Sequence, residues 1–133
     1  EARSEITLPV SGRAIQLLDS ASLVNSKDTE KIVVTGSHGG LIGGDSRRAL
    51  KAQARIGVFN DAGVGIEGIG ITRLPALDQI NVAAVTISYH TARIGDAFST
   101  LETGVISHTN STAKTLGAKK GLALKVWLEN MID

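Results

Sequence analysis

Three apolar runs, each ended by a glycine or a short polar segment, place the strongest constraint on how this chain folds. They are residues 31–35 (KIVVT), 56–59 (IGVF) and 82–88 (VAAVTIS). Such short, β-branched runs are typical of strands buried on both faces of a parallel sheet. The stretches between them are long enough for helical crossovers, so the sequence predicts βαβ units.

Weaker patterns fill in the rest of the chain. Residues 5–10 and 13–18 are predicted to be extended, with a turn at Ser11–Gly12. For residues 13–18, the alternative is a helix that continues through Ala21 and Val24. Helices are predicted over residues 47–54, 67–79 and 104–116, with a helical turn at 97–101. A last amphipathic segment carries Leu124, Trp127, Leu128 and Met131 at helical spacing.

These elements predict one domain over residues 1–133, with an α/β fold. We expect a small three-layer domain with a mainly parallel sheet and glycine-rich strand-end loops. Hydrophobic residues make up 42% of the chain but only 3% are aromatic, so the core is expected to consist of Val, Ile, Leu and Ala.

Charge and composition exclude several classes of partner and chemistry. Lys and Arg (14) nearly balance Asp and Glu (13), which predicts neither a nucleic-acid nor a membrane partner. The absence of cysteine removes disulfides, thiolate metal sites and cysteine nucleophiles, and fits a cytoplasmic location. Because the chain starts at Glu1 rather than Met, the sequence leaves open whether a segment precedes it.

Polar segments follow the three clearest strands directly. They are residues 36–40 (GSHGG), 60–63 (NDAG) and 90–96 (HTARIGD). The carboxyl ends of parallel strands share one edge of the sheet, where α/β proteins bind ligands. The sequence therefore predicts one polar, glycine-rich site at this edge.

The predicted catalytic residues are His38, Asp61 and His90. A histidine beside a glycine-rich turn can act as general acid or base at neutral pH. Asp61 is predicted to assist or orient His38, with an Asx-turn cap as its structural alternative. The three side chains also form a two-histidine, one-carboxylate set, but they lack a diagnostic metal-site spacing, so no metal is predicted.

Arg93 is the predicted anchor for an anionic substrate, because its planar guanidinium pairs well with carboxylates. An Arg93–Asp96 ion pair that pins the loop is the alternative. The amides of Gly39 and Gly40 are predicted to stabilise developing negative charge. The full predicted binding set is Ser37, Gly39, Gly40, Asn60, Arg93 and Asp96.

Three familiar motifs match only in part. Residues 39–46 approach a phosphate-binding loop, but Asp45 stands where that loop needs a lysine. Residues 63–68 spell G-x-G-x-x-G after a strand, yet no acidic residue closes the next strand. Residues 111–114 match S-x-x-K without its usual partner motifs. His108 is ambiguous between pocket and solvent.

These features predict an enzyme, a hydrolase, lyase or isomerase, that acts on a small polar metabolite bearing a carboxylate or an amide. The alternatives are a non-catalytic nucleotide- or metabolite-binding module and an accessory subunit of a larger enzyme. The cofactor stays unknown. A small-molecule ligand is the expected partner, and an exposed patch centred on Trp127 predicts a homo-oligomer.

Overall fold

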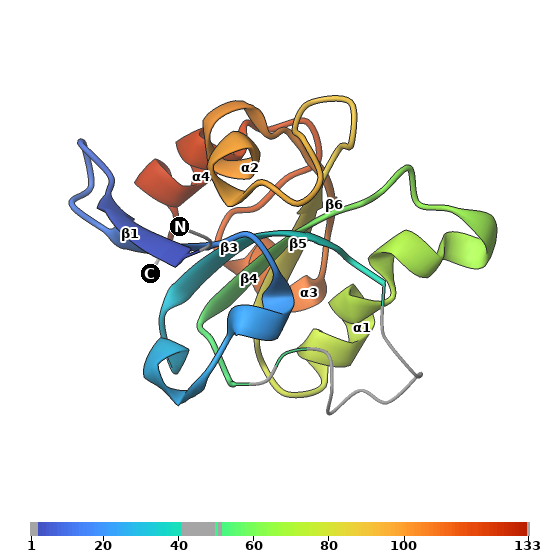
Figure 1. Cartoon of the computed structure of the whole chain (residues 1–133), viewed down its shortest axis with the longest axis horizontal. Coiled ribbons are helices and arrows are strands. Elements are labelled where there is room, and N and C mark those ends of the chain that lie inside the picture. The colour runs from blue at the N-terminus through green and yellow to red at the C-terminus, as the bar shows by residue number, and fades with distance from the viewer. Residues whose placement is uncertain (1–2, 41–49, 51, 133) are drawn as a thin grey trace.

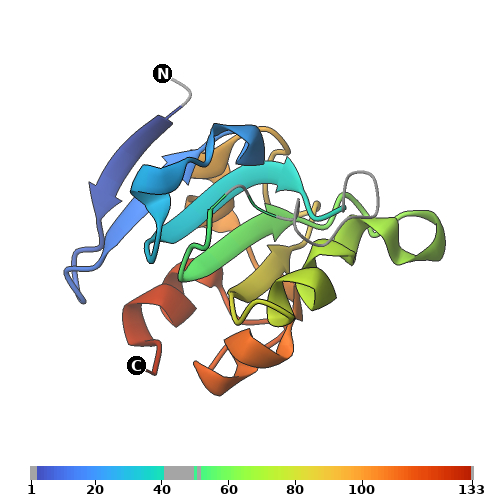
Figure 2. The same cartoon turned by 90° about the horizontal axis from the view of Figure 1, so that it is seen from below.

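A computed structural model describes residues 3–40, 50 and 52–132. Within these residues the backbone forms a six-stranded sheet in the order β1-β2-β3-β4-β5-β6 (Figures 1 and 2). The strands are β1 (Arg3–Thr7), β2 (Ala14–Leu18), β3 (Ile32–His38), β4 (Ile56–Asn60), β5 (Ala83–Ile87) and β6 (Ile106–Thr109). Strands β2 to β5 are parallel, and β1 and β6 pair antiparallel at the two edges. The predicted α/β class with a mainly parallel sheet is confirmed.

The described chain also forms four α-helices and three 3-10 helices, which lie between the strands or follow β6. The α-helices are α1 (Arg73–Asp78), α2 (Ala97–Thr103), α3 (Ser111–Thr115) and α4 (Leu124–Asn130). The 3-10 helices are η1 (Ala21–Leu23), η2 (Ser26–Asp28) and η5 (Ile66–Ile71). All are short, so their stability comes from packing against the sheet rather than from helix propensity.

The central strands are buried on both faces. Strands β4 and β5 are buried at every position. Successive residues of a strand belong alternately to two hydrophobic clusters. In β3, for example, Ile32 and Val34 belong to one cluster and Val33 to the other. Because successive strand residues point to opposite faces, the two clusters lie on opposite sides of the sheet. Residues from α2 and α4 complete the first cluster, and residues from η1 and α1 complete the second.

The predicted helix over 104–116 is wrong in its first half. Residues Ile106–Thr109 form β6 instead, paired antiparallel with β5, and only Ser111–Thr115 is helical. The helix starts where Asn110 caps it, because the Asn110 side chain accepts the N–H of Ala113. Residues 106–109 form a strand because they pair with β5, which is distant in sequence. The local sequence therefore carries no signal that predicts this strand.

The predicted helix over 67–79 is only partly correct. Its first half is the 3-10 helix η5, and α1 begins at Arg73. A Cβ at Gly70 would overlap the backbone of Asp61, so η5 packs too closely on the preceding turn for a larger residue. Pro75 lies in the first turn of α1, where its missing N–H costs nothing.

The remaining predicted elements include two confirmations and two corrections. Strand β2 and the helical turn at 97–101 are confirmed, whereas the first strand spans Arg3–Thr7 rather than 5–10. Trp127 is only 2% exposed, and its Nε1–H donates to the carbonyl oxygen of Leu116. The exposed Trp127 patch was therefore a wrong prediction, and the expected homo-oligomer loses its support.

Two further sequence predictions concern the segment after β3. The helix over 47–54 falls largely outside the described residues, and the described residues 50 and 52–54 are not helical. Most of the partial phosphate-loop match at 39–46 also lies outside them. Among the described residues, no helix is both long and apolar enough to cross a bilayer.

Replacing Asn110 with alanine should destabilise the fold by about 3 kcal/mol or more, because it leaves several buried polar groups unpaired. The Asn110 amide donates to the carbonyl oxygens of Leu74 and Val82 and accepts from the N–H groups of Ala84 and Ala113. Urea unfolding measures the loss. The matched control is Asn130→Ala, because Asn130 is exposed and donates only to Val126. Equal stability of the two variants would contradict this account of the fold.

Candidate functional site

The candidate site is the edge of the sheet where the parallel strands end. We call the residues there the strand-end rim: residues 19, 36–40, 60–63 and 88–96. Register places His38 of β3 opposite Asn60 of β4, and the N–H of Asp61 donates to the carbonyl oxygen of Ile87 at the end of β5. The three predicted polar segments thus follow neighbouring strands.

Buried carboxylate and amide groups tie these segments together. Asp61 is 5% exposed, and its Oδ1 accepts the N–H groups of Gly63 at 2.8 Å and Tyr89 at 3.1 Å. Asn60 is fully buried, accepts the N–H of Ala62 and donates to the carbonyl oxygen of Ala92. These side chains therefore join the turn after β4 to the loop after β5.

The turn after β4 has an unusual backbone. Residues 62–65 all have positive φ, including Ala62 at 51° and Val64 at 68°. Positive φ is unfavourable for a residue with a side chain, especially a β-branched one. The Asp61 hydrogen bonds help to hold this conformation, and such strain is concentrated at functional sites.

The loop before α2 packs directly on β3. The N–H of Gly95 donates to the carbonyl oxygen of Gly36 at 2.7 Å. A Cβ at Gly36 would overlap the backbone of Asp96, so only glycine permits this approach. Asp96 caps α2 by accepting the N–H of Ser99, and Asp19 accepts the N–H of Ala97. Both carboxylates therefore have structural partners.

The end of β3 and the residues that follow it use most of their own polar groups. Ser37 Oγ accepts the N–H of Ala21 at 2.7 Å. The N–H of Gly39 donates to the carbonyl oxygen of Asn60, and that of Gly40 donates to Nδ1 of His38 at 3.0 Å. The amides predicted to stabilise negative charge are thus already hydrogen-bonded within the chain.

Three basic side chains of the rim remain exposed: His38, His90 and Arg93. The His90 ring lies against Tyr89, with the ring centroids 3.9 Å apart. Arg93 has a side chain that is 81% exposed and lies 3.7 Å from a carboxylate oxygen of Asp96. The Arg93–Asp96 ion pair, which was the structural alternative for Arg93, is thus present. It is exposed, and its N–O distance is long.

A hollow of about 430 Å³ lies at one end of the rim. Its lining includes Arg93 and Asp96 from the predicted binding set, but none of His38, Asp61 and His90. Sequence reasoning missed Asp19 and Phe98, which also line it. The signal for Asp19 was available, because it follows a predicted strand directly, as Asp61 does.

Arg73 is a further charged residue that sequence reasoning missed. It is 5% exposed, and burial lowers the pKa of its guanidinium. Its Nε–H donates to the carbonyl oxygen of Gly40, and the guanidinium carbon lies 4.9 Å from the centroid of the Phe59 ring. Arg73 therefore holds the segment after β3 against the start of α1.

Within the part of the chain that the structure describes, no three His, Asp or Glu side chains are arranged to hold a metal ion. No protein-family model, curated protein or solved structure matches this chain. What the protein does therefore has to be inferred from its own residues.

Replacing Asp61 with alanine should destabilise the protein by about 2–4 kcal/mol, because the N–H groups of Gly63 and Tyr89 lose a buried, charged acceptor. Asp61→Asn is the matched control, since it keeps a carbonyl oxygen in the same place and should recover at least half of the loss. Urea unfolding gives both values. Equal destabilisation by the two substitutions would show that these hydrogen bonds do not hold the rim together.

Proposed function

We propose that the protein binds and acts on a small polar metabolite, bearing a carboxylate or an amide, at the strand-end rim. The observation that carries this proposal is a difference in exposure among the rim side chains. Asn60 and Asp61 are buried and fix the backbone, whereas His38, His90 and Arg93 are exposed. A fixed frame that presents basic groups to solvent suits the binding of an anion.

Arg93 is proposed to hold the anionic group of the substrate. Its guanidinium can form two parallel hydrogen bonds with a carboxylate. The competing contact with Asp96 is long, and the Arg93 side chain is 81% exposed. Exposed ion pairs contribute only about 0–1 kcal/mol, so a substrate carboxylate replaces Asp96 at little cost.

His38 is proposed as the general acid or base. Its Nδ1 accepts the N–H of Gly40, so the neutral ring carries its proton on Nε2. That hydrogen bond orients the exposed ring, and this is the role we propose for the Gly40 amide in place of charge stabilisation. The Gly39 amide instead donates to the carbonyl oxygen of Asn60. Asp61 is proposed as a positioning residue for the turns, because both partners of its Oδ1 are backbone N–H groups.

In this proposal the helices over the two core clusters are the outer layers of a three-layer domain, and the glycine-rich strand-end loops form the rim. Proton transfer by His38 requires a ligand that extends from the hollow lined by Arg93 to the exposed His38 ring, and such a transfer fits a hydrolase, a lyase or an isomerase. The rim residues favour none of these reaction types over the others.

A second candidate is a non-catalytic module that binds a nucleotide. Tyr89 is 50% exposed, and a Cβ at Gly63 would lie 3.4 Å from its ring. An exposed aromatic ring beside a glycine-rich turn can stack on a planar base. In this case Tyr89 would bind the ligand, and His38 would have no role in turnover.

Succinate, a small dicarboxylate, is the probe for anion binding at the rim. In a ¹⁵N–¹H NMR titration it should shift the amide signals of residues 36–40, 60–63 and 88–96. Arg93→Gln should weaken binding about fivefold, the value of one exposed charge pair. Lys27→Gln is the control, because Lys27 is exposed and belongs to η2, outside the rim. An equal effect of both variants would refute the proposed role of Arg93.

Comparison of His38→Ala with the native protein separates the two candidate functions. Screening of small carboxylates and amides for turnover should give an activity that this variant loses while it keeps its affinity for succinate. If the module is correct, the screen gives no turnover, adenosine monophosphate shifts the amide signals of residues 60–63 beside the Tyr89 ring, and Tyr89→Ala abolishes those shifts.

A further inference from the structure

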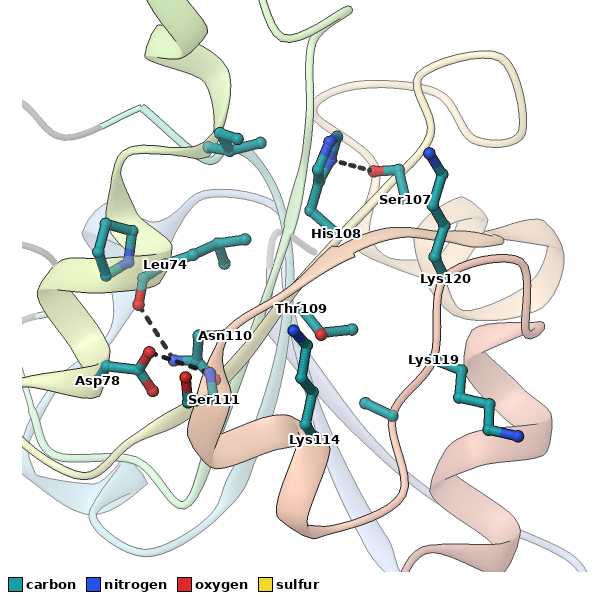
Figure 3. Close-up of a pocket in the computed structure, with 13 residues that line it drawn as sticks. Leu74, Asp78, Ser107, His108, Thr109, Asn110, Ser111, Lys114, Lys119 and Lys120 are labelled. Atoms are coloured by element: carbon teal, nitrogen blue, oxygen red, sulfur yellow. Dashed lines mark hydrogen bonds between the residues drawn. The ribbon is translucent and has the colours of Figure 1, made fainter.

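A second cavity, of about 700 Å³, lies beside edge strand β6 (Figure 3). We call it the lateral pocket. Its walls come from α1, β6, α3 and the turn at 118–120, and no residue of the strand-end rim lines it. Its volume is in the range of small-molecule pockets, about 300–1,000 Å³. It is therefore a separate site that the proposed function does not use.

The lateral pocket is rich in positive charge. Lys114, Lys119 and Lys120 line it, and all three are exposed. Among the described residues, none of these lysines has a carboxylate within ion-pairing distance. In Figure 3 the Lys114 side chain extends toward Thr109 and that of Lys120 runs beside Ser107, whereas Lys119 points away. Within the described part of the chain, the ammonium groups of Lys114 and Lys120 therefore line the pocket without an ion pair, although the positive charge of Lys114 helps to lower the pKa of Asp78.

The single acidic side chain of the lining, Asp78, is already hydrogen-bonded within the protein. Its Oδ2 accepts the N–H of Ser111, and its Oδ1 accepts both the N–H and the hydroxyl of Thr112. Burial raises the pKa of Asp78, but the hydrogen bonds from Thr112 and Ser111 outweigh it, so the pKa is lowered overall. The carboxylate is therefore ionised at neutral pH and bound to the start of α3.

The opposite wall of the lateral pocket is apolar. It consists of the side chains of Ile71, Leu74 and Pro75. On the β6 side, His108 Nδ1 lies 3.3 Å from Ser107 Oγ, which in turn lies 2.9 Å from the hydroxyl of Thr86. These hydrogen bonds fix the orientation of the imidazole. The pocket therefore has one apolar wall and one wall that carries positively charged lysine side chains.

The two walls are held rigidly relative to each other. Asn110 bonds the carbonyl oxygen of Leu74 on α1 while its Oδ1 accepts the N–H of Ala113 on α3. Asp78 makes the second link between the same two helices. A cavity whose walls are fixed before binding loses little entropy when a ligand enters.

We propose that the lateral pocket is a binding site for a small organic anion with a compact apolar body, such as an aromatic carboxylate. The apolar part packs on Leu74 and Pro75, and the anionic group lies between Lys114 and Lys120. Both features are needed, because exposed lysines alone bind a carboxylate weakly and the wall alone has no preference for charge.

Three probe molecules separate these two contributions. 2-Naphthoate has the apolar body and the charge, 2-naphthamide has the same body without charge, and acetate has the charge alone. In ¹⁵N–¹H NMR titrations, 2-naphthoate should shift the signals of residues 71–78 and 107–120 and saturate at millimolar concentration or below. The amide should bind at least about fivefold more weakly. Acetate should give no saturable shifts.

Lysine variants test which charges hold the anion. The double variant Lys114→Gln/Lys120→Gln should weaken 2-naphthoate binding about fivefold to tenfold, whereas Lys119→Gln should change it less than about twofold. All three side chains are exposed, so the variants should fold normally, which unchanged spectra outside the pocket would verify. Arg93→Gln should leave this binding unchanged, which separates the lateral pocket from the rim.

Several outcomes would overturn the inference. Equal affinity for 2-naphthoate and 2-naphthamide would show an apolar cavity with no anion preference. Equal effects of Lys119→Gln and the double variant would show that charge acts only over the whole surface. Absence of saturable shifts at residues 107–120, or shifts at the strand-end rim alone, would show that the lateral pocket binds no such ligand. Only shifts at the strand-end rim bear on the proposed function of the rim, and they would support it while overturning the inference about the lateral pocket.

Discussion

Burial of the central strands on both faces is the constraint from which the other features of this molecule follow. Every residue of β4 and β5 is buried, and alternate residues feed two separate hydrophobic clusters. A charged group within such strands would lose its hydration without compensation. Polar chemistry is therefore confined to the borders of the sheet, where the strands end and where β6 leaves an edge.

The two borders are built in the same way. At the strand-end rim, the buried side chains of Asn60 and Asp61 form hydrogen bonds with backbone groups of the loop after β5. At the lateral pocket, the side chains of Asn110 and Asp78 form hydrogen bonds that link α1 to α3. In both places the carboxylates are hydrogen-bonded within the protein, and the exposed charged side chains are basic. This distribution is the basis for our proposal that both sites bind anions, although the net charge of the chain is only +1.

Local patterns in the sequence were sufficient for the strands of the sheet centre. The runs at 31–35, 56–59 and 82–88 are apolar and stop abruptly, so β3, β4 and β5 were predictable together with the polar segments that follow them. Strand β6 was not predictable from the sequence, because only its pairing with β5 distinguishes residues 106–109 from part of a helix. The lateral pocket was missed for the same reason, since Lys114 and Lys120 flank it only after the chain turns back beside β6.

The roles of individual site residues depended on contacts that no spacing encodes. From the sequence, Asp61 was compatible with a catalytic acid, a metal ligand or a turn cap. In the structure its carboxylate accepts the N–H of Tyr89, 28 residues further along the chain, and this contact supports a structural role. Gly39 and Gly40 resembled charge-stabilising donors until their acceptors, Asn60 and His38, were placed. Exposure separates the groups that hold the fold from those that are available to a ligand.

The most direct test of this account is a crystallographic screen in which crystals of the protein are soaked with a set of small mono- and dicarboxylates. The account predicts bound carboxylates beside Arg93 at the rim and between Lys114 and Lys120 in the lateral pocket. Carboxylates bound instead over the outer surfaces of α2 and α4, with both borders of the sheet empty, would contradict it.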